Sequence, residues 1–315
     1  MEYRELGSTG TVVSRLILGC AGFGGVGSDF ELVGRGETDD QAAEIMDAAW
    51  ELGITTFDTA DAYAGGRSEQ AIGNWIASRG VRPVLTTKTF HPMAPGEDRG
   101  LAPARVRRQV ESSLARLGVD SIDLYLTHEP DPETSLNDTL DALDELVEED
   151  KIGAYGGSHL APALLQQSNG RYRWVQNSFS LLDRADEPEL LPLVEKQGLG
   201  YTPYSPLAGG WLTGKYAPGQ AAPPGSRMSI RPGPYEGLDR DDVWRGLERM
   251  RGWAERHGLE MATVAYAWVL GDPHVTAVLV GPRRPAHMEA AVRALDLTLT
   301  GQEREELRSF FTGSI

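Results

Sequence analysis

Four residues with proton-transferring side chains stand at or just after the ends of apolar runs in the sequence. Asp58 ends one run and Tyr63 follows it, while Lys88 and His128 end the next two. A tyrosine has an ordinary pKa of about 10 and is a poor acid near neutral pH, but a neighbouring ammonium group favours its phenolate and lowers that pKa. These residue types together are typical of a site that passes a proton to a substrate oxygen.

Each of the four side chains has a distinct expected role in such a set. Lys88 supplies the positive charge beside Tyr63. A buried lysine tends to lose its proton, so Lys88 needs a carboxylate partner, and Asp58 is placed to provide one. His128 is then free to donate a hydrogen bond to a carbonyl oxygen and to orient the substrate.

The elements that must position these residues alternate between short apolar runs and amphipathic helical stretches, a pattern that predicts a parallel sheet. Eight such units indicate a closed (β/α)8 barrel, an α/β TIM barrel, whose active site lies at the carboxyl ends of its strands. The expected strands are Arg15 to Cys20, Thr55 to Asp58, Val84 to Lys88, Ile122 to His128, Ile152 to Ser158, Trp174 to Asn177, Gly200 to Tyr204 and Ala277 to Val280.

Helix signals lie between the strands. Thr38 and Gln41 form the pattern of a capping box, and Gly53 ends the helix that this box begins. Pro103 stands where a first helical turn accepts proline, and Gly118 closes the same helix.

Two further segments complete the expected architecture. Tyr3 to Leu6 and Thr11 to Val13 flank a Gly-Ser-Thr-Gly turn and predict an N-terminal β-hairpin that plugs the barrel. The stretch from Ala217 to Gly237 is rich in Pro and Gly and predicts a long loop on the active-site face. We expect residues 1–315 to form one barrel domain.

Composition narrows the class of protein. The formal net charge of −16 argues against a nucleic-acid or anionic-membrane partner. The chain starts without a signal-peptide pattern and holds no membrane-spanning run, so we expect a cytoplasmic protein. Its single cysteine, Cys20, ends an apolar run and predicts a packed thiol, and no cysteine cluster indicates a metal site.

Several longer motifs resemble those of the aldo-keto reductase family, in order along nearly the whole chain. They are Phe57-Asp58-Thr59-Ala60-Asp61-Ala62-Tyr63 with the following Gly65-Gly66-Arg67-Ser68-Glu69, Thr86-Thr87-Lys88, the run from Ser112 to His128, and the run from Tyr204 to Lys215.

This resemblance implies a TIM barrel that binds NADP(H) without a Rossmann domain and reduces an aldehyde or ketone carbonyl. It implies that Tyr63 is the general acid, that Lys88 and Asp58 tune it, and that His128 positions the carbonyl.

The resemblance also implies the cofactor contacts. Ser158 and Gln176 bind the nicotinamide carboxamide, and Tyr204 stacks on the nicotinamide ring. An arginine suits the adenosine 2′-phosphate because its planar fork matches phosphate geometry, which favours NADPH over NADH. The remaining expected contacts are Ser205 and Leu207 at the pyrophosphate, Gly281, Arg283 and His287 at the 2′-phosphate, and His159, Gly209 and Lys215 within the matching segments.

The chain departs from the family pattern at two places. His159 stands where the family usually has asparagine, so an imidazole replaces one expected nicotinamide contact. Where the family commonly has Gln and then Glu and Asn after the last arginine, this chain has His287, Ala290 and Ala291, which predicts fewer adenine contacts.

Other interpretations remain beside this one. Gly22 to Gly27 fits the dinucleotide pattern G-x-G-x-x-G, but a polar loop rather than a helix follows it, which argues against a Rossmann site. Lys88 at a strand end is also where a Schiff-base aldolase places its nucleophile. An NADP(H)-binding redox-sensing or regulatory subunit with slow turnover is the alternative from another functional class.

Substrate choice is less well determined by the sequence. Side chains in the loops either line an aromatic-friendly pocket or pack in the core, and the sequence does not distinguish the two. No heptad repeat or symmetric motif predicts an oligomeric state. The loop residues concerned are Phe23, Phe30, His91, Trp211 and Tyr235.

Overall fold

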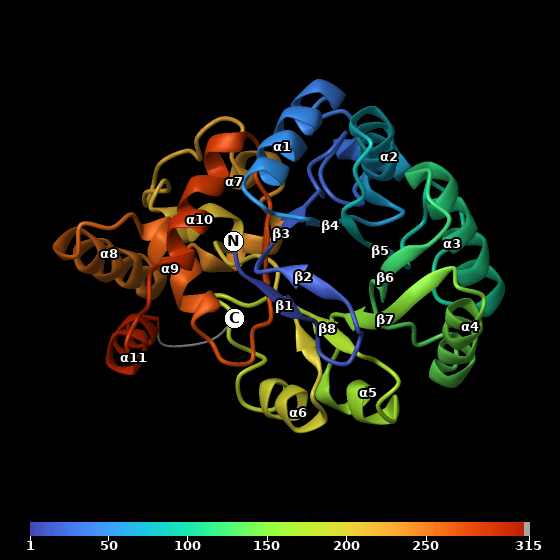
Figure 1. Ribbon diagram of the computed structural model, residues 1–315. Helices are drawn as coiled ribbons and strands as arrows, with labels where there is room; N and C mark the ends of the chain where they lie inside the picture. The colour runs from blue at the N-terminus through green and yellow to red at the C-terminus, as the bar shows by residue number, and fades with distance from the viewer. Residues whose placement is uncertain (312–315) are drawn as a thin grey trace.

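The computed structural model describes residues 1–311 and begins with the expected hairpin. Strands β1 (Tyr3–Glu5) and β2 (Val12–Ser14) pair antiparallel. Figure 1 shows this hairpin lying across the centre of the molecule, inside a ring of helices.

Eight parallel strands form the barrel in the order β10-β3-β4-β5-β6-β7-β8-β9. Backbone hydrogen bonds from Thr276 to Tyr201 (2.9 Å) and from Leu279 to Pro203 (3.0 Å) join the last two segments and close the ring. The predicted (β/α)8 barrel is confirmed, with strand ends that differ by up to three residues from the expected ones. The strands are β3 (Leu16–Gly19), β4 (Thr56–Asp58), β5 (Val84–Thr89), β6 (Ile122–Thr127), β7 (Ile152–Ser158), β8 (Trp174–Gln176), β9 (Gly200–Tyr201) and β10 (Val278–Val280).

Helices surround the strands, and Figure 1 shows α1 to α6 following one another in chain order, with α7 to α11 gathered on the remaining side. They are α1 (Asp39–Glu51), α2 (Arg67–Arg79), α3 (Pro103–Leu117), α4 (Leu136–Glu148), α5 (Pro162–Gln167), α6 (Leu190–Gln197), α7 (Arg227–Ile230), α8 (Asp241–Arg256), α9 (Met261–Leu270), α10 (Glu289–Leu295) and α11 (Gly301–Ser309). Short 3-10 turns are η1 (Phe30–Leu32), η2 (Tyr63–Gly66), η3 (Ala208–Thr213), η4 (Gly233–Leu238) and η5 (Pro285–Met288).

The helix ends follow the local chemistry of the sequence. Thr38 and Gln41 make both hydrogen bonds of the capping box at the start of α1. Pro103 occupies the first turn of α3, and Gly118 ends that helix in the left-handed conformation at φ +67°. These signals could be predicted because a cap depends on neighbouring residues alone.

Two hydrophobic layers hold the barrel together. The larger lies between strands and helices, and Cys20 is buried in it, as predicted. The smaller fills the barrel interior and includes Leu6 from the hairpin, packed with Trp174 and Ile17. A side-chain carbon on Gly7 would lie 2.2 Å from the backbone nitrogen of Gly200, so the turn closely contacts the start of β9. The hairpin therefore closes the amino-terminal end of the barrel.

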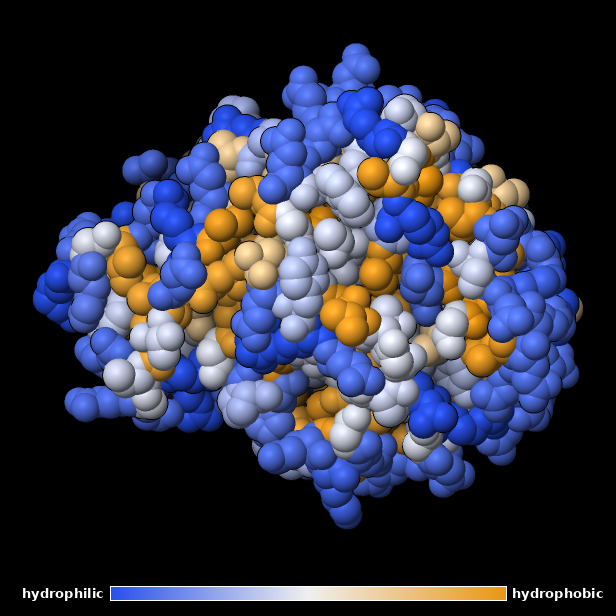
Figure 2. Space-filling model, viewed as in Figure 1, coloured by the Kyte–Doolittle hydropathy of each residue, from blue (hydrophilic) through white to orange (hydrophobic). Residues whose placement is uncertain are grey.

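The surface on this face is mostly hydrophilic. Figure 2 shows blue residues over the outer helices and only separate orange areas. The large hydrophobic residues that are exposed include Tyr3 and Val12 of the hairpin. No helix within residues 1–311 is long and apolar enough to span a membrane.

The prediction of an irregular loop from Ala217 to Gly237 is wrong in part. Helix α7 and most of η4 lie inside that stretch. They are only four and six residues long, so neither spans enough residues to show a helical period, and Pro232 precedes the second one. These turns place arginines over the active-site face, as described below.

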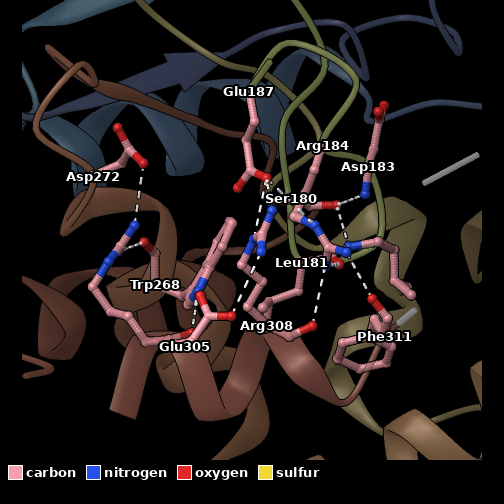
Figure 3. A network of polar contacts seen from close by, with 12 residues as sticks. Ser180, Leu181, Asp183, Arg184, Glu187, Trp268, Asp272, Glu305, Arg308 and Phe311 are labelled. Carbon is pink, nitrogen blue, oxygen red and sulfur yellow. Dashed lines mark hydrogen bonds and ion pairs between the residues drawn. The ribbon is translucent and has the colours of Figure 1, made fainter. Parts of the chain in front are cut away.

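Helix α11 is anchored by a buried arginine in the loop between β8 and α6 (Figure 3). Arg184 is 8% exposed, and its guanidinium donates hydrogen bonds to the carbonyls of Leu181 (2.7 Å) and Phe311 (2.6 Å). On the outer side, Glu187 accepts a hydrogen bond from Arg308 (2.8 Å). The last helix is thus tied to the barrel through its backbone as well as its side chains.

We expect Arg184→Met to lower the free energy of unfolding by about 2–3 kcal/mol, because it leaves buried carbonyls without donors. Urea unfolding followed by circular dichroism measures the change. Arg249→Met is the matched control, since Arg249 is exposed on α8. Equal stability of the two variants would contradict this account of the α11 anchor.

Candidate active site

The carboxyl ends of three neighbouring strands bring the predicted tetrad together. Asp58 ends β4, Lys88 lies near the end of β5, and His128 directly follows β6. Tyr63 begins η2, in the loop after β4. Hydrogen bonds from the backbone nitrogens of Thr59 to Thr86 (2.8 Å) and Asp61 to Lys88 (3.0 Å) continue the β4–β5 pairing beyond the strand. This pairing holds the start of the Tyr63 loop against β5.

A buried ion pair lies at the centre of the site. Lys88 Nζ donates hydrogen bonds to Asp58 Oδ1 and to the carbonyl oxygen of Thr59, the latter at 2.7 Å. Both charged side chains are almost fully buried, at 1% and 3% exposed. Burial opposes the charge on Lys88, but the neighbouring Asp58 and Tyr63 outweigh it, so the pKa of Lys88 is raised and the ammonium form is kept.

Tyr63 lies beside this ammonium group. Lys88 Nζ is 5.2 Å from the centre of the tyrosine ring. Burial raises the pKa of Tyr63 above its ordinary value, and Lys88 acts in the opposite direction. The effect of Lys88 on this pKa has the predicted sign, but burial, which the sequence argument did not include, outweighs it. In this state Tyr63 carries its proton and is ready to donate it.

His128 faces Tyr63 from the neighbouring strand. The two ring centres are 5.5 Å apart, with the planes at 76°. Burial, helped by Lys88, holds the pKa of His128 well below its ordinary value, so the imidazole is neutral. Within residues 1–311 its buried Nδ1 has no hydrogen-bond partner. A neutral imidazole carries one N–H donor, which suits a carbonyl oxygen without adding charge.

The expected nicotinamide contacts lie next to the ion pair. Gln176 Nε2 donates a hydrogen bond to Asp58 Oδ2 (2.9 Å), and Ser158 Oγ donates to the backbone oxygen of Gln176 (2.7 Å). His159, at φ +54°, places its Nε2 3.2 Å from the hydroxyl of Tyr204. The Gln176 side chain thus connects Asp58 to the position where the sequence predicts the nicotinamide carboxamide.

The expected phosphate contacts gather on the other side of the barrel mouth. Ser205 Oγ lies 3.0 Å from the hydroxyl of Tyr235. Gly209 and Gly210 have positive φ, and side chains there would meet Tyr235 and Lys215 at 2.6 Å and 2.4 Å. Leu207 caps η3, while Gly281 follows β10 and leads to Arg283, whose backbone nitrogen lies 3.3 Å from Nδ1 of His287.

The match to a protein-family model identifies the family of this chain. The model of the aldo/keto reductase family matches residues 15–311. The chain belongs to the aldo/keto reductase family.

Relatives match this aldo/keto reductase over nearly its full length. A Bacillus subtilis (strain 168) protein called uncharacterized oxidoreductase YrpG is 35% identical, with 99% of this chain and 97% of the relative covered. A probable voltage-gated potassium channel subunit beta from Arabidopsis thaliana is 30% identical, over 94% and 92%. Versiconal hemiacetal acetate reductase from Aspergillus parasiticus is 29% identical, over 98% and 96%.

In this aldo/keto reductase, the sequence interpretation missed three charged residues at the phosphate side. Arg227 begins α7 and Arg231 directly follows it, while Glu37 directly precedes the cap of α1. Arg227 lies close enough to Arg283 and Lys215 for each positive charge to disfavour the others. The two arginines in the Pro/Gly-rich stretch were the available sequence signal, because positive charges close together stand out in a protein of net charge −16.

The aldo/keto reductase site rests on a second pair of buried carboxylates behind the tetrad. Asp61 Oδ2 accepts a hydrogen bond from Thr89 (2.5 Å), and Glu69 accepts from Thr87 (2.6 Å) and Arg116 (2.6 Å). Burial raises the pKa of Asp61 to about 7. Asp61 in the loop that carries Tyr63 and Glu69 in α2 are thus both joined to β5, the strand that carries Lys88.

The loop side chains divide between core and mouth. Phe23 and Trp211 are buried at 1% and 2% exposed and belong to the core, so they pack rather than line a pocket. His91 lies 4.8 Å from His128 between ring centres, and burial lowers its pKa to about 4. The segment from Gly22 to Gly27 runs into η1 and a further loop before α1, as expected for a chain without a Rossmann helix there.

The buried acid Asp61 makes stability depend on pH. Its pKa is raised to about 7 in the folded chain, against about 3.9 when exposed, so its contribution is greatest at low pH and is lost as the pH rises towards 7. We expect the stability difference between the native protein and Asp61→Asn to fall by on the order of 1–3 kcal/mol from pH 5.5 to pH 8. Urea unfolding of both proteins measures it, and a difference independent of pH would contradict the buried acid.

Proposed function

We propose that this protein is an NADPH-dependent oxidoreductase that reduces an aldehyde or ketone to an alcohol. The observation that carries the proposal is the buried Lys88–Asp58 pair beside the protonated Tyr63 and the neutral His128. Relatives that are called an oxidoreductase and a hemiacetal acetate reductase support the same reaction class.

Residues at the barrel mouth fit a dinucleotide phosphate. Lys215, Arg227 and Arg283 lie near one another, and their mutual repulsion favours binding of an anion between them. Ser226 Oγ, next to Arg227, is buried without a partner in the described part of the chain. The Arg283 side chain is 40% exposed, and its guanidinium offers a planar fork for a 2′-phosphate, which is the reason for preferring NADP(H).

Other predicted contacts divide between the two ends of the cofactor. In this proposal Gln176 and Ser158 hold the carboxamide, and Tyr204 stacks on the nicotinamide ring. His159 takes the place of an amide side chain and contacts the Tyr204 hydroxyl. The pyrophosphate and adenosine contacts are Ser205, Leu207, Gly209, Lys215, Gly281 and His287.

When bound, the reduced nicotinamide supplies the hydride that adds to the carbonyl carbon. Tyr63 and His128 donate hydrogen bonds to the carbonyl oxygen and orient it. As negative charge develops there, Tyr63 transfers its phenolic proton to the oxygen, which completes the alcohol. Lys88 stabilises the phenolate that remains, and Asp58 keeps Lys88 charged.

The same ion pair disfavours an aldolase. A Schiff-base nucleophile must be an uncharged amine, and the raised pKa of Lys88 keeps it an ammonium group. Under our proposal the protein acts on small carbonyl compounds in the cytoplasm and takes no nucleic-acid or membrane partner, consistent with its acidic net charge.

A regulatory subunit with slow turnover is the second candidate. The relatives named as potassium channel subunits beta favour it. The two candidates share a cofactor site and differ in how often one molecule turns over.

Removal of the Tyr63 hydroxyl tests the proposed acid. We expect Tyr63→Phe to lower kcat/KM for 4-nitrobenzaldehyde with NADPH by about 10²–10⁴-fold, because the developing oxyanion loses its proton donor. Nicotinamide absorbance gives the rate. The affinity for NADPH, measured by quenching of tryptophan fluorescence, should change by less than about twofold.

Tyr3→Phe is the matched control, because its hydroxyl contacts Gly53 on the hairpin side and should leave the rate unchanged. Near-normal turnover of Tyr63→Phe would remove the acid assignment.

Turnover counting separates the enzyme from the regulatory subunit. With NADPH and aldehyde in excess, we expect a steady-state rate within about tenfold of the first-turnover rate in stopped flow. One rapid equivalent of NADPH oxidation followed by a rate more than about a hundredfold slower would instead support the regulatory subunit.

A further inference from the structure

A buried carboxylate faces the arginine that we assign to the 2′-phosphate. Glu37 is 3% exposed, and its Oε1 accepts a hydrogen bond from Arg283 Nε at 2.7 Å. Its other oxygen, Oε2, is buried and has no hydrogen-bond partner among residues 1–311. That oxygen rests against Gly22, where an added side-chain carbon would lie 2.1 Å from it.

Arg283 is held on two sides and open on the third. Nη1 donates to the carbonyl oxygen of Gly225, and Nε donates to Glu37. Nη2 makes no hydrogen bond to any described residue, and 40% of the side chain is exposed. The guanidinium is thus oriented but keeps a donor for an anion from solvent.

The pairing differs from an ion pair that only stabilises the fold. A structural pair of that kind has its buried oxygens hydrogen-bonded, since an unpaired buried carboxylate oxygen is costly. Here burial raises the pKa of Glu37, with Arg283 and, more weakly, Arg227 acting in the opposite direction, so these cations offset the cost of burying the carboxylate only in part. The Glu37 carboxylate therefore lies directly beside the arginine that we assign to the 2′-phosphate.

A carboxylate and an arginine have opposite effects on which dinucleotide binds at this end of the site. A carboxylate accepts a hydrogen bond from the ribose 2′-hydroxyl of NADH, whereas it repels the 2′-phosphate of NADPH. Arginine does the reverse by attracting the phosphate. The pair of Glu37 and Arg283 therefore brings both kinds of recognition element to one site.

We propose that Glu37 is a specificity-determining residue that limits the preference of this protein for NADPH over NADH. It partly neutralises Arg283 and holds a negative charge close to the phosphate position. Arg227 and Lys215 supply the attraction that still favours the phosphate. This inference rests on the proposed function, since it assumes that Arg283 meets the adenosine 2′-phosphate.

Binding measurements on charge-removing variants test the inference. We expect Glu37→Gln to raise the ratio of the NADH and NADPH dissociation constants by about tenfold, because glutamine keeps the acceptor for Arg283 Nε without the charge. Fluorescence titrations give the ratio. Calorimetry with adenosine 2′,5′-bisphosphate and with 5′-AMP should show the same change for the 2′-phosphate alone.

Two further variants make the result specific. Glu37→Met removes the charge and the hydrogen bond together and should also raise the ratio, which keeps the test valid if one variant folds poorly. Glu31→Gln makes the same change in net charge at an exposed position of the same loop and should leave the ratio unchanged.

An unchanged or lower ratio in both Glu37 variants would overturn the inference. Arg283→Gln keeps that failure separate from failure of the proposed cofactor site. If Arg283→Gln weakens the binding of NADPH more than that of NADH while the Glu37 variants leave the ratio unchanged, the phosphate site is supported and the proposed role of Glu37 is wrong. If Arg283→Gln affects both cofactors equally, the 2′-phosphate assignment itself is wrong.

Discussion

The ion pair between Lys88 and Asp58 is the interaction on which the site depends. Both groups lie in the barrel mouth out of contact with water, where removing one partner of such a pair typically costs about 3–5 kcal/mol. Neighbouring parallel strands hold the two residues, with Asp58 opposite Thr86 and Lys88 opposite Leu126 in the sheet. The barrel thus supplies the rigidity that keeps an ammonium group charged without solvent, and Tyr63 lies beside that charge.

Charge is distributed unevenly around this centre. The protein is strongly acidic as a whole, yet cations from η3's carboxyl end, α7 and the loop after β10 converge on one side of the mouth. An anionic cofactor is therefore attracted to a local positive region on a negative surface. Glu37 lies beside Arg283 within that region, so under our proposal the choice of cofactor depends on a balance of opposing charges rather than on a single residue.

Much of the fold and the tetrad could be predicted because the signals are local or repeated. The capping box at Thr38 involves neighbouring residues only. The apolar run from Thr55 to Asp58 and the runs after it each end on a polar residue, and these residues mark one edge of a parallel sheet. The net pKa of Tyr63 could not be predicted in direction, because it depends on how completely the folded chain excludes water from the ring.

The remaining misses involve contacts between distant segments. Glu37 and Arg283 are separated by 246 residues, and nothing in either segment indicates that they meet. Helix α7 is too short to show a helical period, so Arg227 was hidden in an apparent loop. Short turns and long-range ion pairs depend on the assembled barrel, whereas strands and caps depend on the sequence beside them.

The transfer of hydride to a carbonyl carbon within this site is the central claim, and isotopic labelling tests it most directly. The protein would be mixed with NADPH carrying deuterium at both C4 positions and with an aldehyde, and the alcohol analysed by mass spectrometry and NMR. Our account predicts one deuterium on the carbinol carbon of every product molecule and a proton from solvent on its oxygen. An alcohol without deuterium, or no alcohol from a protein that binds NADPH and a range of aldehydes, would contradict it.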